Sequence, residues 1–123
     1  MNHFTVLSSD LERSKAFYIN ILGLTEGYRP PFAFPGAWLY AGDQAILHIM
    51  ADKPMPANAA GVIDHMAFTA SNLQAVINTL KQQDIQYELR RLKGPENWQL
   101  FCYDPDGAKV ELDFAASEPE PRE

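Results

Sequence analysis

The sequence repeats itself at an offset of 62 residues, and this repeat constrains the fold more than any other feature. Within residues 61–83, those from residue 63 onward align without a gap with the start of the chain, so that His3 falls on His65 and Leu11 on Leu73. Self-similarity at a fixed offset is the signature of duplicated structural units. We therefore expect two similar modules rather than one irregular fold.

Each copy begins with a short alternating strand, which leads through a polar cap into an amphipathic helix. In residues 2–8, the apolar side chains of Phe4 and Val6 point to one face. Ser9 or Asp10 then caps the helix. Three strand candidates follow each helix: residues 24–28, 37–40 and 45–50 in the first copy, and residues 87–92, 98–103 and 109–114 in the second, with a tight turn at 104–107.

The sequence thus predicts an α+β fold of two tandem βαβββ modules. Module 1 spans about residues 1–50, the linker spans 51–61, and module 2 spans about 62–114. Each half alone is too small to hold a core comfortably, so residues 1–116 are expected to form a single domain. We expect the modules to form one curled mixed sheet, a half-barrel with its helices outside, and the polar residues 115–123 to form a flexible tail.

Composition and charge exclude several classes of protein. Apolar residues make up 46% of the 123 residues and charged residues 21%, which is typical of globular proteins. No run reaches the roughly 20 apolar residues of a membrane helix, and a signal-peptide pattern is absent, so we expect a cytoplasmic protein. The net charge is −6 without a basic stripe, which argues against nucleic acid as a partner. The lone Cys102 cannot form an intramolecular disulfide.

Four side chains of the kinds that bind metals occupy matching places in the repeat. His3 matches His65, and His48 matches Glu111 at an offset of 63. In its strand, each of them faces away from the apolar neighbours. A single histidine in a strand is more often a hydrogen-bonded surface or core residue, but the match of all four favours a shared site. Three imidazoles and one carboxylate predict a divalent metal ion such as Ni, Zn, Fe, Co or Mn.

These motifs resemble those of the vicinal oxygen chelate superfamily, which includes glyoxalase I, bleomycin-resistance proteins and extradiol dioxygenases. The resemblance covers residues 2–114 and rests on HFTVLSSDLERSKAFYINILGL, ILHIM, DHMAF and YDPDGAKVELDF. It implies paired βαβββ modules, commonly a homodimer, and a metal held by the first and last strands of each module. In glyoxalase I-like members, the four ligand positions correspond to His3, His48, His65 and Glu111.

His48 leaves the subgroup open. Its position is most often glutamate in bacterial-type glyoxalase I, and it can be glutamine in epimerase-like relatives. Extradiol dioxygenases use three ligands, matching His3 or its equivalent, His65 and Glu111, and their fourth-strand histidine is an acid–base group. They also carry a characteristic tyrosine before the last turn, and Tyr103 lies near that place but out of register.

The resemblance implies a glyoxalase I-like lyase or isomerase that stabilises the enediolate of a small oxygen-chelating substrate. Glu111 or His48 would be the base. One alternative is a single-domain Fe(II) extradiol-type dioxygenase. The other is a metal-free, ligand-sequestering protein of bleomycin-resistance type. Proteins of that type generally lack the ligand set, so the presence of all four positions favours an enzyme.

Aromatic side chains near the strands predict an apolar or aromatic portion of the substrate, although such side chains also serve as core. Phe32 and Phe34 belong to this group. Arg90 and Arg91 are adjacent in a strand, so only one of them can face a ligand. The residues expected to contact the substrate are Trp38, Tyr40, Trp98, Tyr103 and Arg90.

Overall fold

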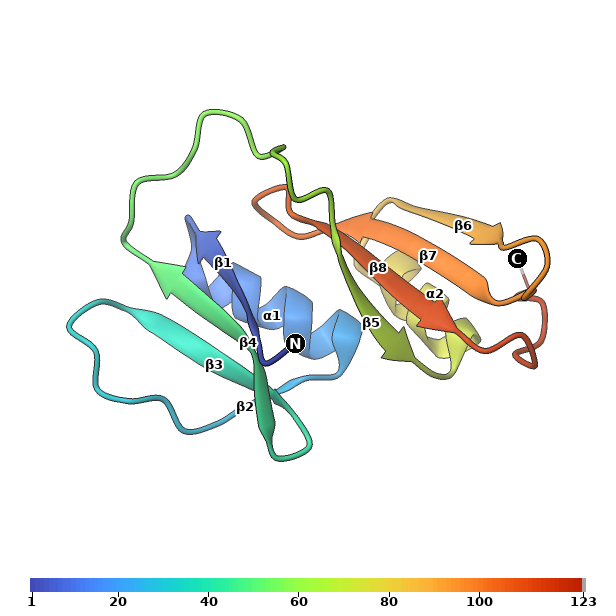
Figure 1. The fold of residues 1–123 in the computed structure, drawn as a ribbon, viewed down its shortest axis with the longest axis horizontal. Helices are drawn as coiled ribbons and strands as arrows, with labels where there is room; N and C mark the ends of the chain where they lie inside the picture. Colours follow the sequence, from blue (N-terminus) through green and yellow to red (C-terminus); the bar gives the residue numbers. More distant parts are fainter. Residues whose placement is uncertain (123) are drawn as a thin grey trace. The chain divides into compact units, whose positions relative to one another are not determined.

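A computed structural model describes residues 1–122 and contains the two modules that the repeat predicts (Figure 1). The first module consists of β1 (Phe4–Ser8), α1 (Leu11–Leu22), β2 (Thr25–Glu26), β3 (Gly36–Ala41) and β4 (Gln44–Ala51). The second consists of β5 (Met66–Ala70), α2 (Leu73–Gln82), β6 (Tyr87–Arg91), β7 (Trp98–Tyr103) and β8 (Lys109–Phe114). The predicted α+β fold of tandem βαβββ modules is confirmed.

Each module holds one four-stranded mixed sheet, and the two sheets have the same topology. The strand orders are β1-β4-β3-β2 and β5-β8-β7-β6. The first and last strands of each module are parallel neighbours, whereas the other pairs are antiparallel. The register repeats as well, because Thr5 pairs with His48 and Ala67 pairs with Glu111. The duplication therefore extends from the order of elements to the pairing of single residues.

The chain divides into two compact units. Residues 1–62 and 104–108 form the first unit, and residues 63–103 and those from 109 onward form the second. The turn at 104–108 belongs to the first unit because one of its side chains is hydrogen-bonded to α1. The Tyr18 hydroxyl donates a buried hydrogen bond of 2.7 Å to the Asp104 carboxylate.

In the first unit, α1 covers one face of the sheet. Asp10 caps the helix by accepting a 3.2 Å hydrogen bond from the Arg13 N–H, and Gly23 ends it at a φ of 74°. Strand residues alternate between the buried face under the helix and a more open face. The core side chains are Phe17, Tyr18, Ile21, Leu39, Leu47 and Ile49. The polar residues of the alternation therefore lie on the face opposite α1.

In the second unit, α2 takes the same place, and its core is also apolar. The buried side chains include Leu73, Ile77, Leu80, Leu100, Leu112 and Phe114. Asn72 caps α2 by accepting a 3.4 Å hydrogen bond from the Ala75 N–H. Neither α1 nor α2, the helices of residues 1–122, has the length and hydropathy that spanning a bilayer requires.

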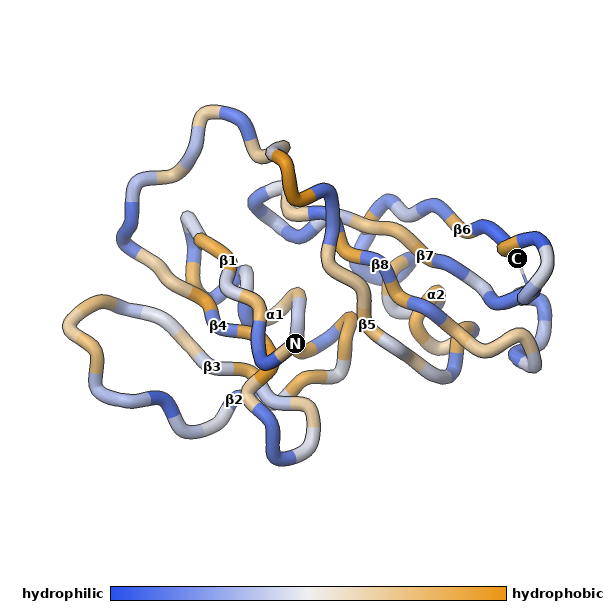
Figure 2. Tube along the Cα trace, viewed as in Figure 1, coloured by the Kyte–Doolittle hydropathy of each residue, from blue (hydrophilic) through white to orange (hydrophobic). Residues whose placement is uncertain are grey.

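Residues 115–122, which their composition predicts to be a flexible tail, form several hydrogen bonds in the structure; residue 123 lies outside the described residues. Figure 2 shows this segment as largely hydrophilic. Its order comes from hydrogen bonds rather than from apolar burial. The Glu118 carboxylate oxygens accept from the N–H of Asn72, the N-cap residue of α2, at 2.8 Å and from the N–H of Leu73, its first residue, at 2.9 Å. The Trp98 indole donates to the Glu118 carbonyl at 3.1 Å.

Replacing the Glu118 carboxylate should therefore destabilise the second unit. The change Glu118→Ala removes a negatively charged cap at the positive end of α2, and we expect the free energy of unfolding to fall by about 1 kcal/mol. Urea denaturation followed by circular dichroism measures the difference. Glu120→Ala is the matched control, because Glu120 carries the same charge in the same segment without capping the helix. Equal losses in both variants would contradict the capping role.

Candidate functional site

The first unit brings His3 and His48 together on the open face of its sheet. The two imidazole rings stack with centroids 3.9 Å apart and planes 12° apart. Trp38 stacks on the other side of His48, also at 3.9 Å. Burial lowers the pKa of His48 from its ordinary value, and His3 adds to this effect because a neighbouring charge of the same sign disfavours protonation. A lowered pKa favours the neutral imidazole, which is the form that binds metals.

The second unit brings His65 and Glu111 together at the equivalent place. Nε2 of His65 lies 3.0 Å from Oε1 of Glu111. The carboxylate is 7% exposed, and its Oε2 accepts a 3.3 Å hydrogen bond from Gln99. The Phe101 ring packs edge-on against His65 at 5.7 Å. Glu111 is thus a nearly buried carboxylate with one oxygen held by an amide and the other beside an imidazole.

His3 and His65 are each held in the same way, by a hydrogen bond between the ring and the side chain of the preceding residue. Nδ1 of His3 lies 2.8 Å from Oδ1 of Asn2, and Nδ1 of His65 lies 2.7 Å from Oδ2 of Asp64. Both oxygens are acceptors, so Nδ1 is the donor and Nε2 of a neutral ring carries the lone pair. The hydrogen bond with His65 also lowers the pKa of Asp64, and the nearby Lys109 ammonium contributes.

This arrangement fits a metal ion chemically. Histidine ligands of metals usually donate their other ring N–H to a carboxylate or carbonyl, which sets the tautomer and the ring orientation. In the second unit, the neutral tautomer would point the Nε2 lone pair of His65 at the Glu111 carboxylate. A proton or a cation has to satisfy both groups, since two acceptors 3.0 Å apart repel.

Each unit supplies two of the four expected ligands. Within residues 1–122, neither unit alone holds a cluster of three or more His, Cys, Asp or Glu side chains suited to a metal. A complete four-ligand set thus requires one pair from each unit. The four-ligand site stays a prediction.

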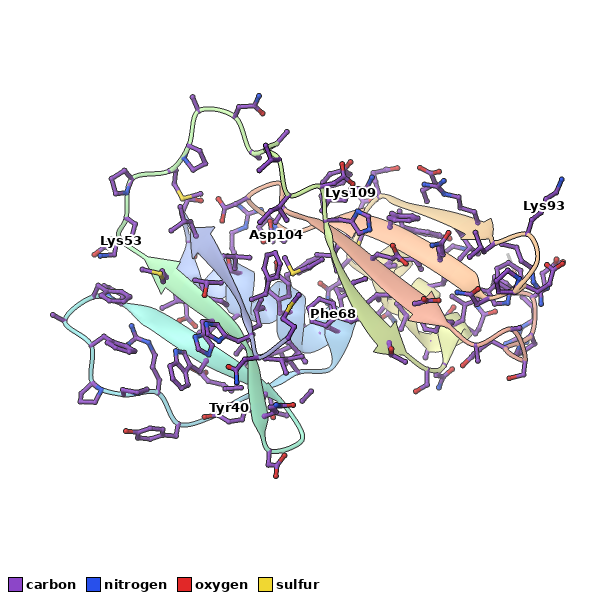
Figure 3. All side chains as sticks on the ribbon, in the orientation of Figure 1. Tyr40, Lys53, Phe68, Lys93, Asp104 and Lys109 are labelled. Carbon is purple, nitrogen blue, oxygen red and sulfur yellow. The ribbon has the colours of Figure 1, made fainter. Side chains whose placement is uncertain are left out.

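The expected substrate contacts of the first unit lie on the face that carries His48. Trp38 pairs with His48 across β3 and β4. Tyr40, labelled in Figure 3, follows two residues later on β3, and its hydroxyl donates a 2.6 Å hydrogen bond to the Tyr28 carbonyl. Both side chains are half-buried. They are therefore within reach of a ligand on this face.

The expected contacts of the second unit divide between its two faces. Arg90 lies on the Glu111 face, with its guanidinium 4.7 Å from the Phe101 ring centroid. Tyr103 shares that face by alternation along β7 and is 57% exposed. Trp98 points the other way and is only 6% exposed, under the Arg91 guanidinium at 4.4 Å. Strand alternation thus places Trp98 in the core face, away from Glu111.

Sequence reasoning missed four residues that shape these surroundings. Asn2 and Asp64 were detectable, because they occupy matching positions in the 62-residue repeat. Gln99 required the pairing of β7 with β8, which places it on the Glu111 face. Arg29, whose guanidinium packs against the Phe32 and Phe34 rings, lies in the loop between β2 and β3, where no period or motif marks it.

Two tandem βαβββ modules with a donor pair at the same register of each sheet define a protein with the vicinal oxygen chelate fold. Sequence comparison agrees, since a profile of the Glyoxalase/Bleomycin resistance protein/Dioxygenase superfamily matches residues 1–112. The chain belongs to this superfamily, as its motifs indicate.

Known relatives and solved structures agree with this assignment. The chain is 29% identical over 119 residues to Glyoxylase I 4 of Arabidopsis thaliana, covering 91% of this chain and 68% of the relative. It is 27% identical over 119 residues to a lactoylglutathione lyase of Salmonella typhimurium, covering 89% and 88%. A variant of the fosfomycin resistance protein FosX from Listeria monocytogenes, complexed with Mn(II) and 1S,2S-dihydroxypropylphosphonic acid, shares the fold with a TM-score of 0.75 at 19% identity, covering 94% and 91%.

The hydrogen bond from Gln99 to Glu111 should contribute measurably to stability. The change Gln99→Leu keeps the side chain's approximate size but removes a donor to a nearly buried carboxylate. We expect the free energy of unfolding to fall by about 1–3 kcal/mol, because the nearly buried carboxylate would lose its hydrogen-bond donor without regaining water. Thermal and urea unfolding measure this loss. Gln86→Leu, at an exposed position before β6, should change stability by less than about 0.5 kcal/mol.

Proposed function

We propose that the protein is a metal-dependent lyase or isomerase of glyoxalase I type, acting on a small substrate with two adjacent oxygens. In this proposal, His3, His48, His65 and Glu111 together hold one divalent cation. The observation that supports this proposal is that each unit holds a pair of metal-binding side chains at matching positions. The proposal requires the pairs to meet around one ion, within one chain or in a homodimer.

The relationship to known proteins supports the reaction class. One relative, 27% identical, is a lactoylglutathione lyase. The FosX variant was complexed with Mn(II), which supports a divalent ion for the fold without deciding which ion this chain prefers.

A bound divalent ion would supply a Lewis acid that polarises two adjacent substrate oxygens and lowers the cost of removing a proton from the neighbouring carbon. Glu111 is the first candidate for the base. Gln99 holds one of its carboxylate oxygens, which fixes the orientation of the other. Glu111 would take a proton from one carbon and return it to the next, while the hydroxyl proton passes from one substrate oxygen to the other, so the isomer forms without another reactant.

His48 is the second candidate for the base. Its lowered pKa keeps the ring neutral and able to accept a proton, and the stack between His3 and Trp38 holds its orientation. A histidine in this position that acts only as an acid–base group would favour the Fe(II) dioxygenase alternative. The role of His48 therefore decides between two reaction classes.

Loss of either member of the second pair should abolish metal retention. We expect chains with His65→Ala or Glu111→Ala to retain almost no metal after dialysis, while circular dichroism shows an intact fold. Elemental analysis of the purified protein gives the metal-to-chain ratio. Glu88→Ala is the matched control, since Glu88 is an exposed carboxylate that pairs with Phe101 on the same sheet. Metal content equal to that of the unchanged chain in both ligand variants would refute the site.

The change His48→Gln separates a ligand from a base. If His48 is a ligand, both metal content and activity should fall. If it is only the base, metal content should persist while kcat falls by about 10²–10⁴-fold. Lactoylglutathione formation and catechol-dependent O₂ uptake identify the reaction class. A chain that retains no metal and gains no activity from added metal would instead be a ligand-sequestering protein.

A further inference from the structure

A small pocket lies against the sheet face that carries His48. Its volume is about 110 Å³, and its lining is mainly apolar. The Phe32 and Phe34 rings stack with centroids 5.4 Å apart, and Phe32 also lies 6.3 Å from Trp38. Because Trp38 stacks on His48, the pocket wall continues directly to a proposed metal ligand.

One cationic group lines this apolar pocket. The Arg29 guanidinium carbon lies 5.0 Å from the Phe32 ring centroid and 5.1 Å from that of Phe34. Its Nη2 donates a 2.8 Å hydrogen bond to the Phe34 carbonyl. A Cβ on Gly36 would clash with the Ile49 carbonyl oxygen and would come within 2.9 Å of the same nitrogen, so the glycine leaves room for the neighbouring strand and for the guanidinium. Arg29 is therefore held in place against two rings.

The charge of Arg29 has no counter-ion in the described part of the chain. No carboxylate of residues 1–122 forms an ion pair with Arg29 or with Lys53, whose ammonium lies 4.3 Å from the Phe34 ring. Figure 3 labels Lys53 just beyond the end of β4. Two cations without an ion pair in residues 1–122 thus flank an aromatic wall, in a chain whose net charge is −6.

We propose that this pocket binds the flat apolar end of a carboxylate-bearing ligand, with Arg29 donating hydrogen bonds to the carboxylate. The ring faces would contact the apolar part, and the guanidinium N–H groups that do not bond to Phe34 would donate to the carboxylate oxygens. This proposal rests on the proposed function. It adds that the substrate of the enzyme is a small aryl or branched alkyl acid.

The size of the pocket limits the ligand. Pockets for drug-sized ligands measure about 300–1,000 Å³, so about 110 Å³ holds a single ring or a short branched chain. A bulky polar conjugate would have to leave most of its atoms outside. Arg29 then determines the charge of the ligand, and the rings determine its shape.

Benzoate and benzamide test this assignment, because they differ in charge and hardly in shape. The full chain, treated with a chelator so that no cation attracts the carboxylate, is titrated with each probe. The indole N–H signal of Trp38 is followed by NMR. We expect benzoate to bind more tightly than benzamide. In Arg29→Met, we expect benzoate affinity to fall by about tenfold or more and benzamide affinity to change by less than about twofold.

Arg91→Met is the matched control, because Arg91 also lies over an aromatic ring, that of Trp98, but does not line this pocket. It should leave both affinities unchanged. An equal loss for both probes in Arg29→Met would show that Arg29 only braces the loop, and equal binding of the two probes by the unchanged chain would refute anion selection. Either result would overturn the inference.

A separate metal titration distinguishes this inference from the proposed function. Metal binding without a preference for benzoate would overturn the assignment of substrate class alone. A preference for benzoate that depends on Arg29, in a chain that binds no metal, would overturn the enzymatic function and leave an anion-binding pocket.

Discussion

The parallel pairing of the first and last strands of each module is the constraint on which the rest of the structure depends. It places His3, the residue before β1, beside the middle of β4, and it places His65, the residue before β5, beside the middle of β8. Parallel strands are joined by a crossover, and here the helix and two further strands provide it. Two donors distant in sequence thereby become neighbours on the sheet face opposite the helix.

The same scaffold carries different chemistry in its two copies. In the first unit, His48 stacks between two flat rings, and burial keeps it neutral. In the second unit, the equivalent Glu111 is a nearly buried carboxylate that needs a proton donor or a cation. Asn2 and Asp64 repeat this contrast, since one is a neutral amide and the other a charged acid. The donor pair of the second unit therefore has two carboxylates around it, those of Glu111 and Asp64, whereas the first unit has the cationic, aromatic pocket.

Alternation along the strands predicted which side chains share a face, and it was correct wherever the strands are regular. Arg90 and Arg91 lie on opposite faces of β6, as adjacency requires. Trp98 belongs to the core face, because its parity along β7 is that of Leu100 and not that of Phe101. In residues 115–122, a single carboxylate of a hydrophilic segment caps α2, a contact that composition alone does not predict.

The sequence by itself determined the duplication, the βαβββ order and the matched positions of the four donors. These features follow from periodicity and from a fixed offset, both of which are local properties of the chain. Only the tertiary structure decided which side chains form hydrogen bonds with the metal-binding residues, such as Gln99 with Glu111. It also decided that the turn at 104–108 belongs to the first unit. It also decided that Arg29 lies over two rings and forms no ion pair with a carboxylate of residues 1–122. Such contacts join residues with no fixed spacing in sequence, so they depend on strand pairing and loop packing rather than on any pattern that the sequence displays.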